Sequence, residues 1–268
     1  MSYWQGKVAL ITGGSAGLGF SIAEALGGLG ASVMIAARDG ERLQAAVGRL
    51  REEGYRVAGF ATDVSDPERV NALVASTIKE FGGLDILVNN VGRSTRGNVL
   101  ETSPDEFRDL LELNFLSVVR CTQAAAAHLI ESRGHVVNIG SLASKSASKF
   151  LGAYPASKFA VAAYSQQLRY ELKPQGVHVL LVCPGPIARP DAGQRYDAET
   201  SDLPESARHP GGGVKLRGIP PEVLAAKILR ACERRRLELI VPAKARWLFA
   251  ISQLWPALGD RIITKLSS

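Results

Sequence analysis

The amino-acid sequence predicts an α/β fold, a doubly wound parallel sheet in a single domain with a C-terminal helical extension. Short apolar runs alternate with long helical stretches along the chain, which favours a parallel sheet covered by helices on both faces. The first apolar run ends in a glycine-rich turn that opens a helix. The 268 residues, 46% hydrophobic and 22% charged, are enough for one large core.

Seven runs have the length and apolar composition of buried strands. They cover residues 7–12, 32–37, 56–62, 84–89, 135–139, 178–182 and 237–241. Right-handed crossovers between them give the doubly wound topology, which places ligands at the carboxyl ends of the strands.

Two of the intervening helices have recognisable starts. Ser65-Asp66-Pro67-Glu68 and Ser103-Pro104-Asp105-Glu106 each offer a capping box with proline at the first helical position.

The turn after the first strand carries four glycines in seven residues, 13 to 19. Glycines permit positive φ angles and let backbone N–H groups approach a diphosphate, and the helix N-terminus favours negative charge. A plain βα turn needs one or two glycines, so the pattern favours a dinucleotide site.

Tyr154 and Lys158 lie four residues apart on a predicted helix and therefore share one face. An ammonium near a phenol favours the phenolate, which suits proton transfer in carbonyl reduction or alcohol oxidation. An ordinary helix surface produces the same spacing, so the pair gains meaning only from the rest of the sequence.

Other classes of function find little support in the composition. The three cysteines are scattered and are expected to be buried, reduced thiols, and the four histidines form no ligand motif, so we expect no metal.

No apolar run approaches the roughly 20 residues of a spanning helix, and strand one begins too early for a signal peptide. We expect a cytoplasmic protein. The net charge of +6 is spread along the chain without a nucleic-acid-binding pattern, so we expect no nucleic-acid partner.

Taken in order, these motifs resemble the short-chain dehydrogenase/reductase family over about residues 5–242. The resemblance implies a Rossmann fold with substrate loop 186–220, and an extension over 243–268. It rests on the glycine turn, Asp63-Val64, Asn89-Asn90-Val91-Gly92, Asn114, Ser141, Tyr154, Lys158 and Pro184-Gly185.

The resemblance also implies roles. Tyr154 exchanges the proton, Lys158 lowers the Tyr154 pKa and binds the nicotinamide ribose, Ser141 holds the substrate oxygen, and Asn114 positions a water for proton relay. The implied cofactor-binding residues, together with Tyr154 and Lys158, are Gly13, Ser15, Gly17, Leu18, Gly19, Arg38, Asp63, Val64, Asn90, Val91, Gly92, Pro184, Gly185 and Ile187. From the residues alone, Ser141 also fits a helix cap and Asn114 a buried amide that bridges backbone groups.

The end of the second strand favours NADP(H) over NAD(H). Ala37 stands where NAD-binding relatives carry an aspartate, and the guanidinium of Arg38, which follows, suits a 2′-phosphate. In the alternative interpretation, Arg38 is solvated and Asp39 binds the ribose.

One motif departs from the family. Arg189 stands where the family often carries a threonine that contacts the nicotinamide, and it is a candidate to reach a phosphate or an acidic substrate. Residues 186–220 are expected to form a substrate lid that orders on binding. The basic segment 144–149 is either ordinary surface or a site for an acidic group.

The C-terminal segment 244–266 combines two tryptophans and many aliphatics with four basic residues. It fits either a bilayer interface, as in relatives that reduce lipid-like or steroid-like ketones, or an amphipathic tail packed on the protein or on a partner subunit.

The sequence therefore predicts an NADP(H)-dependent oxidoreductase that reduces a ketone or aldehyde, or oxidises the alcohol, and acts on a lipid-like substrate. The family resemblance implies a homodimer or homotetramer. The alternative is a non-catalytic dinucleotide-binding or sensing protein of the same fold. A nucleic-acid or membrane scaffold has only the charge and the tail in its favour.

Overall fold

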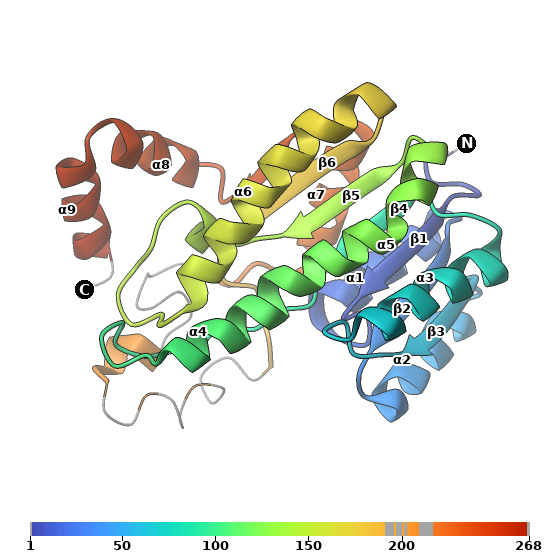
Figure 1. Ribbon diagram of the computed structural model, residues 1–268, viewed down its shortest axis with the longest axis horizontal. Helices are drawn as coiled ribbons and strands as arrows, with labels where there is room; N and C mark the ends of the chain where they lie inside the picture. Colours follow the sequence, from blue (N-terminus) through green and yellow to red (C-terminus); the bar gives the residue numbers. More distant parts are fainter. Residues whose placement is uncertain (1, 191–195, 197–199, 201–202, 209–216, 267–268) are drawn as a thin grey trace.

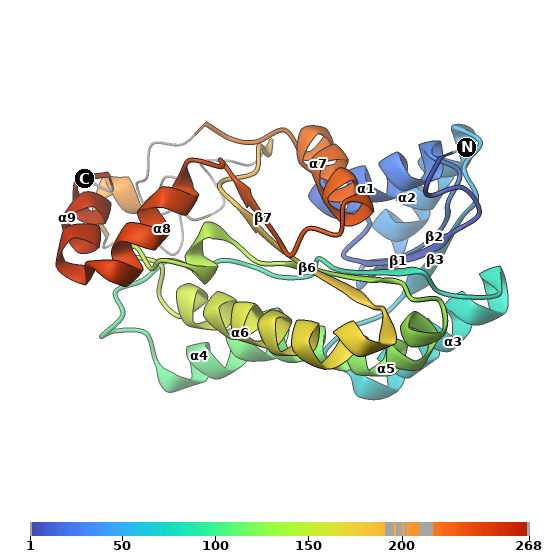
Figure 2. The same ribbon diagram turned by 90° about the horizontal axis from the view of Figure 1, so that it is seen from above.

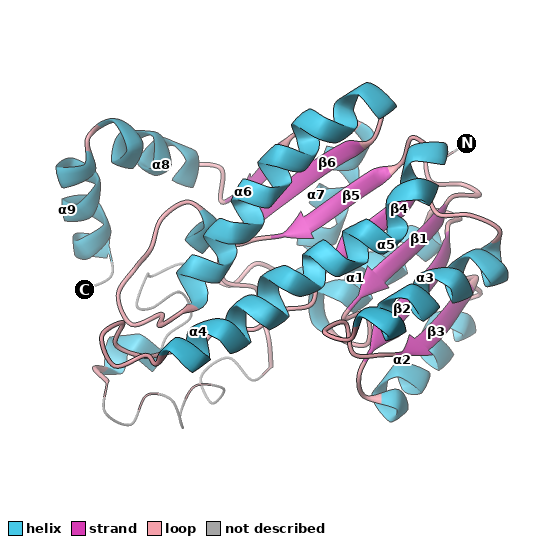
Figure 3. Ribbon diagram, in the orientation of Figure 1, coloured by secondary structure: helices cyan, strands magenta, loops and turns pink. Residues whose placement is uncertain are grey.

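The computed structural model describes residues 2–190, 196, 200, 203–208 and 217–266, and its centre is one seven-stranded sheet. The strands follow the order β3-β2-β1-β4-β5-β6-β7, and every neighbouring pair is parallel. All seven carboxyl ends therefore lie at the same edge, where the arrowheads point in Figure 3. The doubly wound parallel sheet is confirmed.

The strands differ from the predicted runs only at their ends. They are β1 (Val8–Thr12), β2 (Ser32–Ala37), β3 (Val57–Ala61), β4 (Ile86–Asn89), β5 (His135–Ile139), β6 (His178–Pro184) and β7 (Glu238–Val241). The run 84–89 loses its first two residues, and just before β4 the Asp85 side chain accepts a hydrogen bond from the backbone of Val8 and pairs with Lys7.

Helices cover both faces of the sheet (Figure 2). One face carries α1 (Gly17–Gly28), α2 (Gly40–Glu52) and α7 (Pro221–Glu233). The other carries α3 (Pro67–Phe81), α4 (Pro104–Leu111), α5 (Ser117–Glu131) and α6 (Tyr154–Leu172). A π-helical turn, Glu112–Leu116, joins α4 to α5.

The two predicted helix starts have different outcomes. Ser103 caps α4 through a complete capping box with Glu106, as predicted. At α3 the proline at the first helical position is confirmed, but the capping box was wrong, because Asp66 is the cap and its carboxylate accepts from the backbone of Glu68 and Arg69. Ser65 instead hydrogen-bonds Asp63.

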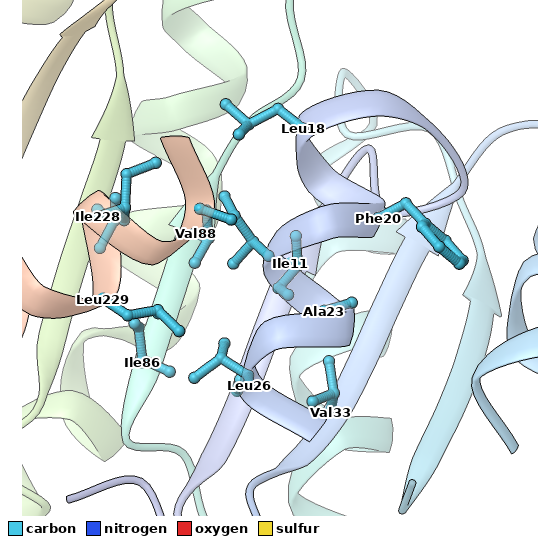
Figure 4. Packing of buried hydrophobic residues seen from close by; sticks show 14 of the residues in the cluster. Ile11, Leu18, Phe20, Ala23, Leu26, Val33, Ile86, Val88, Ile228 and Leu229 are labelled. Carbon is cyan, nitrogen blue, oxygen red and sulfur yellow. The ribbon is translucent and has the colours of Figure 1, made fainter. Parts of the chain in front are cut away.

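The core fills both sides of the sheet because the central strands are buried on both faces. Figure 4 shows one side, where Leu26 of α1 and Ile228 of α7 pack with Ile11 and Val88 of the sheet. The strand order reverses between β1 and β4, and in such folds this switch point opens a crevice at the carboxyl edge.

Two helices follow the sheet, α8 (Ala245–Leu254) and α9 (Pro256–Leu266). They pack against each other beyond the carboxyl edge of the sheet (Figure 1). Gly259 permits this approach, since a Cβ there would stand 2.4 Å from the Ser252 hydroxyl oxygen. The helical extension is confirmed. Within the described part of the chain, no helix has the length and apolarity needed to cross a bilayer.

Candidate active site

A cavity of about 770 Å³ lies at the carboxyl edge of the sheet. Its walls come from the loops after all seven strands, from the start of α6, and from α8 and α9. Every residue predicted for catalysis or cofactor binding lines this cavity except Gly19 and Asn114. Such a volume suits a small organic ligand.

The glycine turn forms one wall. Gly13 and Gly17 have φ values of +66° and +54°, which other residues rarely adopt. The first turn of α1 opens at Gly17 and contains no acidic residue, so its N–H groups and dipole favour an anion. A Cβ on Gly14 would stand 2.6 Å from the Ile35 Cβ, which shows how closely the turn approaches the sheet. These features fit a dinucleotide.

Gly19 lies behind the cavity wall, unlike Gly13 and Gly17, the other glycines of the turn predicted to bind the cofactor. It is buried and does not line the cavity, and a Cβ there would lie 2.2 Å from the Gly13 carbonyl oxygen. Its role is to let α1 pack closely behind the turn.

Asn90 fastens the glycine turn to β4. Its Nδ2 donates to the carbonyls of Thr12 at 3.0 Å and Gly13 at 3.1 Å. The Thr12 hydroxyl in turn accepts from the backbone of Asn90 and Val91. Asn90 therefore shapes the cavity as well as lining it.

The loops after β2 and β3 contribute two charged residues to the cavity wall, Arg38 and Asp63, and Asp39 follows Arg38 in the sequence. Arg38 and Asp63 form an ion pair at 3.9 Å, while hydrogen bonds from Ser65 lower the pKa of Asp63. Asp39 is occupied elsewhere, because its carboxylate caps α2 at Arg42 and pairs with the Arg42 guanidinium. The site thus offers Arg38, and not Asp39, to a ligand.

Tyr154 is the first residue of α6, and its side chain lines the cavity beside Ser141. Burial raises the pKa of Tyr154, while its hydrogen bond with the Ser141 hydroxyl and the charge of Arg96 act to lower it. The Ser141 hydroxyl also caps a short 3-10 turn through the Ala143 backbone. The helix-cap interpretation of Ser141 is confirmed, and its predicted hold on the substrate oxygen stays a prediction.

Lys158 lies beside Tyr154 at the end of β5. Its Nζ donates to the backbone carbonyl of Ile139 at 2.9 Å and lies 6.0 Å from the centroid of the Tyr154 ring. Its predicted effect on the Tyr154 pKa stays a prediction. Burial lowers the pKa of Lys158 itself to about 8.

Asn114 lies within the π-helical turn, fully buried and outside the cavity. Its Oδ1 accepts from the Arg93 backbone at 2.9 Å, and its Nδ2 donates to the Arg93 carbonyl at 2.8 Å and to the Ser157 hydroxyl at 2.9 Å. The side chain therefore bridges backbone groups and holds the loop after β4, as in the second interpretation from sequence, while its predicted role in positioning a water stays a prediction.

Arg189 reaches the glycine turn. One of its guanidinium nitrogens lies 3.9 Å from the position of a Cβ on Gly17. The preceding backbone is fixed, because Ala188 donates to Ile219 and Ile219 donates to Pro186, each at 2.8 Å. The side chain thus carries a positive charge to the N-terminus of α1.

The basic segment 144–149 contributes only two serines, Ser146 and Ser148, to the cavity. Lys145 pairs with Glu238 at 2.6 Å and Lys149 is exposed. Its lysines therefore form no site for an acidic group in this cavity. Most of loop 186–220 lies outside the described residues, so its predicted role as a lid stays a prediction.

Among the residues of the cavity wall that sequence reasoning did not single out are three polar residues in mutual contact: Ser94, Arg96 and Tyr196. Arg96 is buried and its guanidinium carbon lies 3.7 Å from the centroid of the Tyr196 ring. A signal for Arg96 was present, because it follows the carboxyl end of a predicted strand. The sequence held no comparable signal for Tyr196.

A second group of polar residues lies at the opposite, amino edge of the sheet. His135, His178 and Cys232 are buried and place ligand atoms within 4.8 Å of one another. The sequence showed no ligand motif because the three residues come from β5, β6 and α7. The two His Nδ1 atoms are 2.9 Å apart and hydrogen-bonded to each other.

The sequence and the fold are similar to those of known enzymes. The model of the short chain dehydrogenase family matches residues 7–200. A putative ketoacyl reductase of the granaticin polyketide synthase from Streptomyces violaceoruber is 39% identical over 188 residues, 69% of each chain.

Two solved structures cover nearly the whole chain. L-Sorbose reductase from Gluconobacter frateurii, complexed with NADPH and L-sorbose, has a TM-score of 0.78 and 30% identity over 88% of this chain and 95% of its own. A short-chain dehydrogenase/reductase from Burkholderia phymatum, in complex with NAD, has a TM-score of 0.80 and 27% identity over 95% and 96%.

Proposed function

This chain belongs to the short-chain dehydrogenase family, and from that premise we propose that it is an NADP(H)-dependent oxidoreductase that reduces a ketone or aldehyde, or oxidises the corresponding alcohol. The observation that carries the proposal is the meeting of Tyr154 and Ser141 with the glycine turn in one cavity.

The chain's own residues supply the proton chemistry. When bound, the dihydronicotinamide supplies a hydride to the carbonyl carbon. The Tyr154 hydroxyl donates its proton to the carbonyl oxygen, and the Ser141 hydroxyl hydrogen-bonds the same oxygen as charge develops. The raised pKa of Tyr154 keeps the phenol protonated at neutral pH, which suits the reducing direction.

The cofactor residues fit a dinucleotide with a 2′-phosphate. The first turn of α1 receives the diphosphate, with Arg189 beside it, and Arg38 takes the 2′-phosphate. Asp39 is committed to capping α2, which weighs against NAD(H). Lys158 would bind the nicotinamide ribose from its buried position beside the cavity.

Apolar walls support a lipid-like substrate. The cavity beyond Tyr154 is lined by aliphatic and aromatic side chains, several of them from the C-terminal helices: Leu113, Leu142, Leu151, Leu248, Phe249 and Ile263. Such walls favour a substrate with a hydrocarbon body.

The test compares Tyr154→Phe with Tyr170→Phe, which alters an exposed tyrosine on the same helix. Tyr154→Phe should lower kcat for ketone reduction at least about 100-fold, within the range for one acid–base group, while NADPH still binds. Turnover equal to that of Tyr170→Phe would refute the catalytic role. NADPH binding without turnover of any carbonyl compound by the unaltered protein would favour the sensing alternative.

The outer face of α8 supports contact with a membrane surface. Phe249 packs into the protein, while Trp247, Leu254 and Trp255 are exposed beside the basic Arg246. This combination fits the interface of an anionic bilayer. Trp247→Ser/Trp255→Ser should reduce sedimentation with phosphatidylglycerol vesicles, whereas Val99→Ser/Leu100→Ser, at another exposed apolar site, should not.

The alternative is that the outer face of α8 contacts a partner subunit. If the tryptophan variant sediments with vesicles as before but changes the mass in analytical ultracentrifugation, the face joins subunits instead. A homodimer or homotetramer stays a prediction that the same ultracentrifugation measures.

A further inference from the structure

Arg96 lies on the loop after β4, directly beside the start of α6. Gly97 donates from its backbone to the Phe150 carbonyl at 3.3 Å, and Gly152 donates to the Gly97 carbonyl at 3.1 Å. These bonds form a parallel bridge between Gly97 and Leu151, three residues before Tyr154. The backbone therefore fixes Arg96 next to the proposed proton donor.

The guanidinium group of Arg96 is held in the cavity wall. The residue is only 6% exposed. Its Nε donates to the Ala207 carbonyl at 2.8 Å and its Nη1 donates to the Thr95 carbonyl at 2.9 Å. The group stacks on the Tyr196 ring, whose hydroxyl hydrogen-bonds Ser94. A positive charge is thus fixed at one place with little freedom to move.

The charges around the cavity are unevenly distributed. Among the described residues its wall contains one acidic side chain, Asp63, and several basic ones: Arg38, Arg93, Arg96, Lys158, Arg189 and Lys244. The proposed cofactor accounts for Arg38, Lys158 and Arg189. Of the remaining three, Arg96 alone is buried, and it is the one fixed beside the bridge that precedes Tyr154.

We infer that the substrate is a carbonyl compound that also carries a carboxylate, and that Arg96 binds this carboxylate while the carbon chain lies against α8 and α9. The inference rests on the proposed function. Guanidinium and carboxylate match each other in geometry and charge, and their hydrogen bonds are stronger inside a protein than in water.

A purely structural role is the alternative. Arg96 links Thr95 to Ala207, and this link alone would explain its burial. A structural role predicts that loss of Arg96 harms charged and uncharged substrates equally. A carboxylate site predicts that it harms the charged substrate alone.

The experiment compares 4-oxo-, 5-oxo- and 6-oxodecanoic acids with their methyl esters, so that the charge changes while the carbon skeleton stays the same. With NADPH, the unaltered protein should show a kcat/KM at least about 10-fold higher for one acid than for its ester. Arg96→Gln should lose about 10- to 100-fold on the acid, the range for a hydrogen bond to a charged group, and under about 3-fold on the ester. Arg96→Lys should restore part of the preference because it keeps the charge. Arg108→Gln, at an exposed arginine of α4 outside the cavity wall, is the matched control.

Binding to the NADP⁺-loaded protein is measured alongside, so that the outcome does not depend on turnover. An Arg96-dependent difference in Kd between acids and esters supports the carboxylate site even if no compound is reduced, in which case only the proposed function fails. Equal kcat/KM and equal Kd for acids and esters in the unaltered protein overturn the carboxylate site. Equal losses on both in Arg96→Gln, with Arg96→Lys no better, do the same.

Discussion

Lys158 donates its hydrogen bond to the Ile139 carbonyl at 2.9 Å, and its Nζ lies 6.0 Å from the centroid of the Tyr154 ring. The ammonium is thus fixed to the end of β5, near the Tyr154 ring. Burial moves the two groups in opposite directions, lowering the Lys158 pKa and raising that of Tyr154.

The pH dependence of NADPH-driven reduction should follow Lys158. Its pKa of about 8 means that the ammonium is mostly present at pH 7 and is lost as the pH rises through 8. We expect kcat/KM to be constant from about pH 6 to 7.5 and to fall about tenfold per unit well above the pKa. Lys158→Arg, which keeps its charge, should shift the fall to higher pH. A profile that stays flat to about pH 9.5 in the unaltered protein would contradict this assignment.

Arg38 should determine the choice between the two nicotinamide cofactors. Arg38→Ala removes the charge proposed for the 2′-phosphate, so the Kd for NADPH should rise about 10- to 100-fold while that for NADH stays nearly the same. Fluorescence titration measures both constants. Arg42→Ala, an exposed arginine paired to Asp39 nearby, serves as control. The proposed preference for NADPH is contradicted if Asp39→Asn raises the Kd for NADH by a larger factor than Arg38→Ala raises the Kd for NADPH.

Arg189 should act on both cofactors alike, because NADPH and NADH share the diphosphate. Its guanidinium lies near Gly17 at the N-terminus of α1. Arg189→Thr, which introduces the residue often found at this position in the family, should raise both Kd values by a similar factor, about 10-fold. Arg217→Thr, at an exposed site outside the cavity wall, should change neither. A loss confined to NADPH would place Arg189 at the 2′-phosphate instead.

Gly19 and Gly48 offer opposite tests of helix packing. Gly19→Ala would bring a Cβ to 2.2 Å from the Gly13 carbonyl, so the free energy of unfolding should fall by about 1–3 kcal/mol. Gly48→Ala meets no atom within 4 Å in the middle of α2 and should raise it by about 0.5–1 kcal/mol. Chemical denaturation gives both values. Equal stability of Gly19→Ala and the unaltered protein would show that the turn relaxes freely.

His135 and His178 form a hydrogen-bonded chain at the amino edge of the sheet. The Arg236 carbonyl can only accept, so His178 Nε2 carries a hydrogen and, in the neutral ring, its Nδ1 accepts from His135 Nδ1. The bare His135 Nε2 then accepts from the Tyr3 hydroxyl at 2.7 Å. Neutral rings satisfy every partner in this chain.

The hydrogen-bonded pair of His135 and His178 should make the free energy of unfolding depend on pH in the acid range. Burial, with smaller contributions from His178, Arg235 and Lys7, lowers the pKa of His135 to about 3, below its ordinary value of 6.5. The unfolded state therefore binds the proton first, so the contribution is complete above about pH 6.5 and is lost as the pH falls toward 3. Denaturation from pH 7.5 to 4.5 should show a steeper loss for the unaltered protein than for His135→Gln/His178→Gln. His128→Gln, outside the pair, should keep the original slope.

Much of the fold was predictable because it depends on local pattern. Buried strands such as β5 appear as continuous apolar runs, and the capping box at Ser103 is a short sequence signal. The cap of α3 was misassigned because Ser65 and Asp66 both suit the position, and only the contact of Ser65 with Asp63 decides between them.

The candidate site was predictable to a lesser extent. Tyr154, Ser141 and the glycine turn line one cavity, as their motifs indicated. Asn114 and Lys158 carry the right motif but hydrogen-bond Arg93 and Ile139, and no local pattern specifies those backbone partners.

By itself, the sequence determined the alternation of strands and helices, the glycine turn, and the helix that begins at Tyr154, since each depends on residues a few positions apart. The tertiary structure alone brought Arg96 beside Tyr154 and His135 against His178. These contacts between distant residues follow from the strand order, the strand register and the hydrogen bonds that fix the loops. All three depend on how distant segments pack together, so no single segment of the sequence encodes the contacts.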